Sequence, residues 1–155
     1  MTSDLGHWEY PNEIDPDQWF GFIYRIVHKS TGKNYIGKKQ FHSYTRKKIK
    51  GRKNRKRIVK ESKWREYTGS SKALNTDIEE FGMDQFIFTI ESLHETRGSL
   101  FYAEVVKQVT ENVLRETLDN GDRMYYNGHI GSTKFLPPME TINESKHKIN
   151  HQGKH

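Results

Sequence analysis

The strongest constraint on the fold lies between residues 20 and 41, which read FGFIYRIVHKSTGKNYIGKKQF. Aromatic and β-branched residues dominate the first part of this stretch, and such residues favour extended strands. The segment HKSTGK contains turn-forming residues, among them Gly32, which can adopt a positive φ. We therefore predict a β-hairpin, with residues 19–27 as the first strand and NYIG as the returning one.

This hairpin determines where Tyr24 and Tyr35 point. If the turn is centred on residues 30 and 31, Tyr24 faces Gly37 and Ile26 faces Tyr35. Opposed residues point to the same side of a sheet, so both hydroxyls should emerge on one face. Gly37 should leave room beside Tyr24 for something other than a side chain. Taken alone, the pattern is more typical of tyrosines that simply pack in a hairpin.

Length and composition limit the class of protein. A chain of 155 residues is long enough for one domain with a core and too short for two comfortable ones. No apolar run approaches the ~18 residues of a membrane span, and the start MTSDLGHWEYPNE lacks a signal-peptide pattern. The absence of cysteine excludes disulfides, thiolate zinc sites and thiol nucleophiles. We expect no membrane partner and a reducing, cytoplasmic setting, which would be the host cytoplasm if a phage encodes the chain.

A dense basic block follows the hairpin. Residues 38–65 contain fourteen Lys and Arg against one acid, Glu61, which leaves a net charge of +13 in 28 positions. Such a block repels itself unless a polyanion lies against it, and each neutralised phosphate releases counterions. We predict that it contacts nucleic acid; a solvated basic loop is the alternative. The predicted DNA-binding residues are Lys39, Lys47, Lys48, Arg52, Lys53, Arg55, Lys56, Arg57 and, beyond the block, Lys72.

The segment YTGSSKALNTDIEEFG, residues 67–82, has the features of a helix. Ser70 or Ser71 can cap its N-terminus, and Gly82 can end it. Its apolar residues are Leu74, Ile78 and Phe81, spaced i, i+4 and i+7.

Residues 85–93, QFIFTIESL, alternate well enough to form a third strand. Residues 99 to about 116 form the clearest helix, because their apolar residues fall on one stripe, and we expect Glu104 at its border to face the sheet. The stripe consists of Tyr102, Val105, Val106, Val109 and Val113. The order of elements predicts an α+β domain, with a small three-stranded antiparallel sheet flanked by helices.

We divide the chain into three parts. Residues 1–18 are interpreted as an acidic N-terminal arm, and residues 139–155 as a polar C-terminal tail. The folded domain is expected at residues 19–138, with a basic insertion at residues 43–65.

Several motifs in a fixed order resemble the GIY-YIG nuclease superfamily, and in particular phage-type GIY-YIG homing endonucleases. They are FIY at 22–24, YIG at 35–37, the segment GSSKALNTDIEEFGMDQFIFTIE at 69–91, Glu104, which lies 22 residues after Gly82, and Asn127 in YYNG. The resemblance covers roughly residues 20–130 and implies a metal-dependent DNA endonuclease. The first motif departs from the family in having Phe22 where glycine is usual.

The resemblance also implies roles for individual residues. Glu104 would hold a single Mg²⁺ or Mn²⁺, because hard cations prefer oxygen ligands. Tyr24 would be the general base or would position the water. A free phenol has a pKa near ~10, so Tyr24 needs a neighbouring cation, for which Lys38 is well placed in the sequence. Tyr35 would hydrogen-bond the scissile phosphate or the water, and Asn127 would fix the site by hydrogen bonds.

Two further site residues are expected after YIG. Relatives carry an arginine on a helix there, which would bind the phosphate through two parallel hydrogen bonds. Arg46 is the nearest candidate, with Arg52, Arg55 or Arg57 as alternatives because extra basic residues interrupt the region. His42 would share the proton transfer.

Two functions remain open from the sequence. The first is a DNA endonuclease, either a free-standing homing-type enzyme or another phage-style nuclease, which would form a homodimer on DNA if it cuts both strands. The second is a non-catalytic nucleic-acid-binding module that uses residues 38–65. Tyr24, Tyr35 and Glu104 favour the endonuclease.

Overall fold

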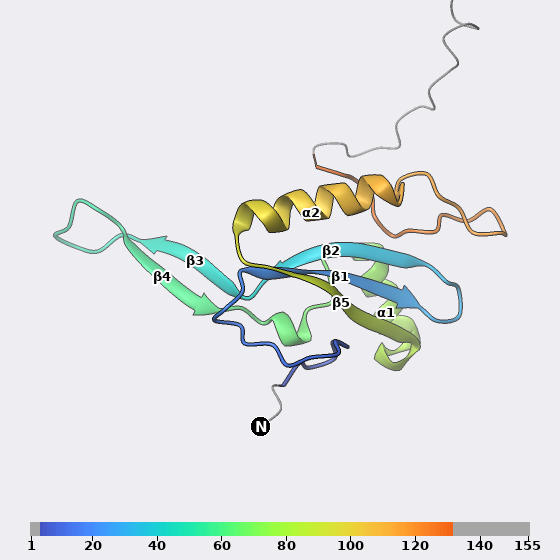
Figure 1. Ribbon diagram of the computed structural model, residues 1–155, viewed down its shortest axis with the longest axis horizontal. Coiled ribbons are helices and arrows are strands. Elements are labelled where there is room, and N and C mark those ends of the chain that lie inside the picture. Colours follow the sequence, from blue (N-terminus) through green and yellow to red (C-terminus); the bar gives the residue numbers. More distant parts are fainter. Residues whose placement is uncertain (1–3, 132–155) are drawn as a thin grey trace, which may run out of the picture.

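The computed structural model describes residues 4–131 and confirms the predicted α+β class (Figure 1). Its elements are β1 (Gly21–His28), β2 (Asn34–Gln40), β3 (His42–Lys47), β4 (Lys56–Glu61), α1 (Lys72–Phe81), β5 (Phe86–His94) and α2 (Arg97–Thr110), with 3-10 turns at Trp64–Glu66 and Met83–Gln85. The main antiparallel sheet has the strand order β2-β1-β5, and β3 and β4 form a separate two-stranded sheet. In Figure 1, α2 lies along one side of the main sheet, and the β3–β4 hairpin projects away from the body.

The predicted hairpin register is confirmed. Tyr24 pairs with Gly37 and Ile26 pairs with Tyr35 across β1 and β2. On its other side β1 pairs with β5, so β1 is the central strand.

The sheet separates two cores. Because side chains alternate along a strand, β1 directs Phe22, Tyr24 and Ile26 to one face, here called the tyrosine face, and Ile23 to the other, the α2 face. The tyrosine face packs against Trp8, Ile14, Phe41, Trp64, Leu74 and Ile78. The α2 face packs against Leu100, Val113, Leu114 and Tyr125.

Helix α1 begins and ends close to where the sequence predicts. Ser71 is the N-cap, and its Oγ accepts a hydrogen bond from the Leu74 N–H at 3.2 Å. Gly82 ends the helix with a φ of 93°, a conformation that glycine adopts without strain. Phe81 departs from the prediction, since it is exposed rather than part of the core.

Helix α2 differs from the prediction in both length and orientation. It begins at Arg97 and ends at Thr110, and Asn112 adopts a positive φ of 52°, so the helix does not continue to residue 116. The predicted apolar stripe does not face the sheet. Tyr102 is 73% exposed, and the stripe's other helical members, Val105, Val106 and Val109, are also exposed.

The face of α2 that meets the sheet is instead partly polar. Leu100 and Gln108 are buried there, and Glu104 lies between them at the i, i+4 spacing. Glu104 binds Lys38, and Gln108 donates to the Ile36 carbonyl. Hydrogen bonds that involve charged groups stabilise by about 1.5–3 kcal/mol, which is comparable to burying an aliphatic side chain. The orientation therefore follows from these partners, and a pattern of apolar residues cannot reveal it.

The basic segment forms a β-hairpin. The family resemblance had instead implied a helix after YIG. Strands β3 and β4 pair from His42 and Glu61 at the base to Lys47 and Lys56 towards the tip. The expectation of a helix is wrong for this chain. The segment KRIVK contains the β-branched residues Ile58 and Val59, which favour a strand.

The N-terminal segment packs into the domain and is not a separate arm. Trp8 is 4% exposed and Ile14 is 2% exposed. The Trp8 indole lies 5.0 Å from the Tyr24 ring, and its N–H donates to the Trp64 carbonyl at 2.7 Å. Glu9 also exchanges backbone hydrogen bonds with β5, through Phe88 and Ile90.

Two predicted parts of the chain lie outside the described residues: positions 132–138 of the expected domain and the tail at 139–155. Within residues 4–131, neither helix has the length and apolar character needed to cross a membrane.

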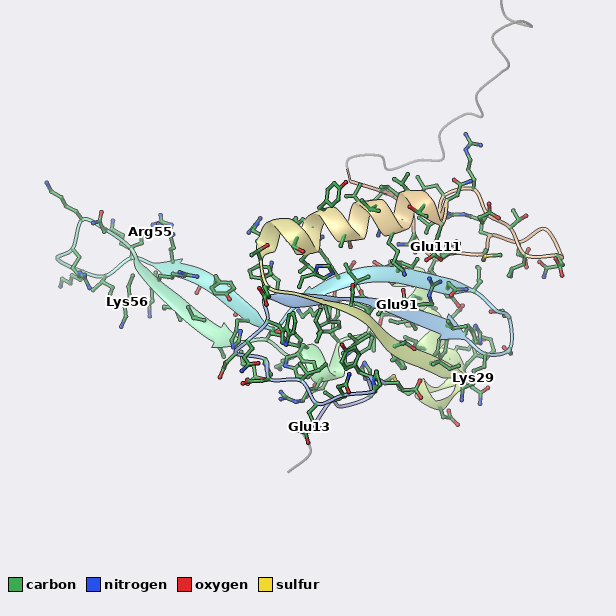
Figure 2. The ribbon with its side chains drawn as sticks, viewed as in Figure 1. Glu13, Lys29, Arg55, Lys56, Glu91 and Glu111 are labelled. Atoms are coloured by element: carbon green, nitrogen blue, oxygen red, sulfur yellow. The ribbon has the colours of Figure 1, made fainter. Side chains whose placement is uncertain are left out.

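We predict that Trp8→Ala lowers the free energy of unfolding by about 3–5 kcal/mol, because it empties a site beneath Tyr24. Denaturant unfolding monitored by circular dichroism measures the effect. Glu13→Ala is the control, since Glu13 is exposed in the same segment and points away from the body (Figure 2). Equal stability of the two variants would mean that the segment is not part of the core.

Candidate active site

Tyr24 and Tyr35 lie together on the tyrosine face. Their ring centroids are 6.1 Å apart, and Tyr24 is only 1% exposed. The Tyr24 phenol lies over Gly37, where a Cβ would be 2.6 Å from its Cζ atom. The expectation that Gly37 leaves room for something else is therefore wrong, because the Tyr24 ring itself takes that space.

A third tyrosine, Tyr67, completes this aromatic wall and was missed from the sequence. Its ring meets the Tyr24 ring edge to face at 6.0 Å, and the Lys39 ammonium lies 4.3 Å from its centroid. It comes from the segment before α1, far from the hairpin in sequence. Its only local signal was an aromatic residue beside a TGSS turn.

The turn after Tyr67 holds the two hairpin tyrosines in place. Gly69 has a φ of +85°, and a Cβ there would lie 3.1 Å from Tyr35 and 3.2 Å from the Tyr24 hydroxyl. The Tyr35 hydroxyl is 3.2 Å from the Ser70 Oγ. A glycine at position 69 thus allows the turn to approach both phenols.

Glu104 and Lys38 face each other on the α2 face. The Lys38 ammonium donates to Glu104 Oε1 at 2.7 Å and lies 4.3 Å from the Phe101 ring centroid. Glu104 therefore enters the site with its charge balanced by a lysine from β2.

Asn127 fixes the edge of β2. Its Oδ1 accepts from the Ile36 N–H at 3.0 Å, and its Nδ2 donates to the Ile36 carbonyl at 2.8 Å. The Gln108 amide donates to the same carbonyl at 3.0 Å. Asn127 is 3% exposed, so this is a buried clamp on the backbone of the YIG strand.

These groups line one hollow of about 430 Å³ at the edge of β2, here called the β2-edge hollow. Side chains from the tyrosine face and from the α2 face meet in it because β2 is an outer strand. The predicted residues that line it are Tyr24, Tyr35, Lys38, Lys39, His42, Glu104 and Asn127. The lining residues that sequence reasoning did not assign are Tyr67, Ser70, Gln108 and His129, with Gln40, Ser43, Ser62 and three glycines.

The sequence of this domain matches a known protein family. Residues 8–130 match the family described as "Putative endonuclease segE, GIY-YIG domain". The chain belongs to this GIY-YIG family. It is therefore a nuclease, and its substrate is DNA. Searches of curated proteins and of solved structures found no match.

His42 lines the β2-edge hollow, whereas Arg46 does not. His42 begins β3, and its Nε2 lies 3.3 Å from Asp17 Oδ1. Arg46 lies further along β3 and lines a different hollow. Arg52, Arg55 and Arg57 also belong to the outer hairpin, so no arginine of residues 4–131 lines the β2-edge hollow.

The other predicted DNA-binding residues are distributed outside this hollow. Lys72, the first residue of α1, is exposed. Apart from Lys39, the other lysines predicted to bind DNA lie on the projecting β3–β4 hairpin, where Lys56 is labelled in Figure 2. In this GIY-YIG domain, Lys39 is thus the cation that accompanies the tyrosines.

The protonation of the tyrosines follows from their environment. Burial raises the pKa of Tyr24 well above its ordinary value of 10.0, and Tyr35, Tyr67 and Glu104 raise it further. Burial also raises the pKa of Tyr35, while its hydrogen bond with Ser70 opposes the shift. Both phenols are therefore protonated at neutral pH and can donate hydrogen bonds. The expectation that Lys38 lowers the pKa of Tyr24 is wrong, because Lys38 points to the α2 face and neutralises Glu104.

Among residues 4–131, no three or more His, Asp or Glu side chains lie close enough together to hold a metal ion. Glu104 is the single carboxylate among the described residues that line the β2-edge hollow. A site of this kind suits a cation that keeps most of its waters and takes one protein carboxylate, as Mg²⁺ does.

We predict that Gly37→Ala displaces the Tyr24 ring, at a cost of about 1–3 kcal/mol in unfolding free energy. DNA cleavage should fall by more than about tenfold, because misplacing a reacting group by ~1 Å can cost 10²-fold. Gly98→Ala is the control, since a Cβ at this exposed helix position meets nothing within 4 Å. Wild-type cleavage in Gly37→Ala would show that the seating of Tyr24 does not matter.

We also predict an alkaline loss of stability that depends on Tyr24. Above pH ~10, the unfolded chain releases the tyrosine proton while the folded chain keeps it, so the free energy of unfolding falls as pH rises. Urea unfolding at about pH 9 and about pH 11 should show a smaller loss in Tyr24→Phe than in wild type. Tyr102→Phe changes an exposed tyrosine and should match wild type. Identical pH dependence in all three proteins would contradict the raised pKa of Tyr24.

Proposed function

We propose that this nuclease is a divalent-metal-dependent DNA endonuclease that hydrolyses phosphodiester bonds in the β2-edge hollow. The observation that carries the proposal is the meeting of two hydroxyl donors, Tyr24 and Tyr35, with the Glu104 carboxylate in one hollow. The donors suit phosphate oxygens or a water, and the carboxylate suits a hard cation.

Glu104 is the residue that would hold the metal, Mg²⁺ or Mn²⁺. When bound there, the cation would stabilise the negative charge that develops on the phosphate oxygens and promote ionisation of a water. The Lys38 ammonium, which donates to Glu104 Oε1 at 2.7 Å, would orient the carboxylate.

The tyrosines would act as hydrogen-bond donors. With the pKa of Tyr24 raised by burial, the water-positioning role suits it better than removal of a proton. Tyr35, which Ser70 orients, would hold a phosphate oxygen or the same water. Lys39 would provide positive charge beside the tyrosines and so take the phosphate-binding role that was expected of an arginine.

His42 is the candidate for proton transfer. A neutral imidazole nitrogen can accept a proton from a water, and the Asp17 carboxylate, 3.3 Å from His42 Nε2, would orient the ring. In the proposed step the water oxygen bonds to phosphorus and gives up a proton to His42. The P–O3′ bond breaks, and the 3′ oxygen takes up a proton from solvent, while the imidazolium later returns the water's proton to solvent.

We propose a free-standing homing-type or phage nuclease whose DNA affinity comes mainly from the basic β3–β4 hairpin. Each chain has one such hollow among its described residues, so cutting both strands would take a homodimer or two successive events. A supercoiled plasmid distinguishes these outcomes, because a single nick gives an open circle and a paired cut gives a linear product.

The test is incubation of a plasmid with the purified protein in Mg²⁺ or in EDTA. We predict cleavage in Mg²⁺ and none in EDTA. Glu104→Gln should abolish cleavage while DNA binding stays within a few-fold, because lysine and arginine contacts to phosphates supply most of the affinity. Exposed Glu79→Gln on α1 is the matched control and should cleave normally.

The alternative, a non-catalytic DNA-binding module, predicts binding without cleavage under all of these conditions. Substantial cleavage by Glu104→Gln would remove Glu104 from the site but leave the nuclease assignment intact.

A further inference from the structure

A second hollow lies beside the base of the hairpin, on the side where α2 begins. It has a volume of about 330 Å³ and is lined by Phe20, Tyr44, Thr45, Arg46, Arg57 and Arg97. The three arginines come from β3, β4 and the first turn of α2, so the fold brings them together from distant parts of the chain. We call them the arginine triad.

Aromatic rings orient two of the guanidinium groups. The Tyr44 and Phe20 rings stack with centroids 5.9 Å apart and an angle of 3° between their planes. The Arg57 guanidinium lies 4.8 Å from the Tyr44 centroid, and that of Arg97 lies 4.6 Å from the Phe101 centroid. A guanidinium that stacks on a ring keeps its N–H edges available for an anion.

The triad is electrostatically unfavourable without an anion. Arg46 and Arg57 are direct cross-strand partners, and like charges in that position destabilise a sheet. Arg97 is at the N-terminus of α2, where the helix dipole disfavours a cation. Among residues 4–131, no carboxylate forms a salt bridge with any of the three, whereas Arg25 binds both Glu91 and Glu111.

The triad is continuous with the active site. Side chains at positions 42, 44 and 46 point to the same side of β3, and His42 at the start of this row lines the β2-edge hollow. Four residues along a strand span about 13 Å, so the triad lies a few nucleotides away along a bound strand.

We propose that Arg46, Arg57 and Arg97 form a phosphate-binding site for one backbone phosphate of the substrate DNA, outside the catalytic hollow. Arginine suits this role because its planar group donates two parallel hydrogen bonds to one phosphate. The site would position the strand so that another phosphate reaches Tyr24 and Glu104. This inference rests on the proposed function, since it presupposes that DNA is the ligand.

The test is DNA binding by fluorescence anisotropy, using a labelled mixed-sequence duplex in EDTA so that no cleavage occurs. Arg97→Gln should weaken binding about tenfold, as expected for a lost charge-assisted contact. In a protein that already carries Arg46→Gln and Arg57→Gln, the same change should cost less than about threefold, because the three arginines share one phosphate. Removing all three should lower the slope of log affinity against log salt by about 0.9, the value for one phosphate.

The matched control removes three lysines from the opposite side of the hairpin: Lys47, Lys56 and Lys60, each to Gln. If these touch separate phosphates, their effects should add, and the slope should fall by up to about 2.7. Arg97→Lys is a second variant that keeps the charge, and it should still weaken binding because it loses the paired hydrogen bonds. All of these residues are exposed and none forms a salt bridge among residues 4–131, so melting temperatures should not fall.

Additive effects within the arginine triad, or wild-type binding by Arg97→Gln or Arg97→Lys, would overturn the site and leave a general basic surface. Failure of the wild-type protein to bind the duplex would reject DNA as the ligand, and with it both this inference and the proposed function. Wild-type binding followed by cleavage in Mg²⁺, together with additive arginine effects, would reject the inference alone.

Discussion

The buried clamp on Ile36 is the interaction on which the geometry of the β2-edge hollow depends. β2 is an outer strand, and the Ile36 amide and carbonyl point away from β1. Asn127 satisfies both groups, and Gln108 adds a second donor from α2. Unpaired, each buried group would cost about 1–3 kcal/mol. The clamp therefore joins three distant parts of the chain, and it fixes the strand that carries Tyr35 and Lys38.

The position of this hollow at a sheet edge explains how side chains from opposite faces of the sheet line the same space. In the middle of a sheet, the backbone would separate the Tyr24 hydroxyl from the Glu104 carboxylate. At β2 the two faces open into the same hollow, with protonated phenols on one side and a lysine–glutamate pair on the other. The site thus combines neutral donors with a balanced charge pair, an arrangement suited to a ligand that brings its own negative charge.

The parts of the fold and of the candidate site that could be predicted from the sequence are those fixed by neighbouring residues. The register of Tyr24 and Gly37 followed from the two-residue period of strands and the turn between them. Glu104 came from the family resemblance, since its position on α2 depends on the partner that Lys38 provides across the sheet. Tyr67 could not be predicted, because only the tertiary path brings it beside the hairpin. The prediction that the apolar stripe of α2 faces the sheet was wrong for a related reason. Apolar periodicity takes no account of the polar contacts of Glu104 and Gln108, which lie on the face that meets the sheet.

The closed base of the β3–β4 hairpin separates the outer hairpin mechanically from the body. The Ser62 N–H donates to the Phe41 carbonyl at 2.8 Å, and the Ser62 hydroxyl to the Gln40 carbonyl at 2.6 Å. Phe41 and Trp64 pack edge to face just below, at 4.9 Å. The two ends of the hairpin thus enter and leave the body at adjacent points. Beyond His42 and Ser43, the hairpin can therefore change in length or charge without moving the residues that line the β2-edge hollow.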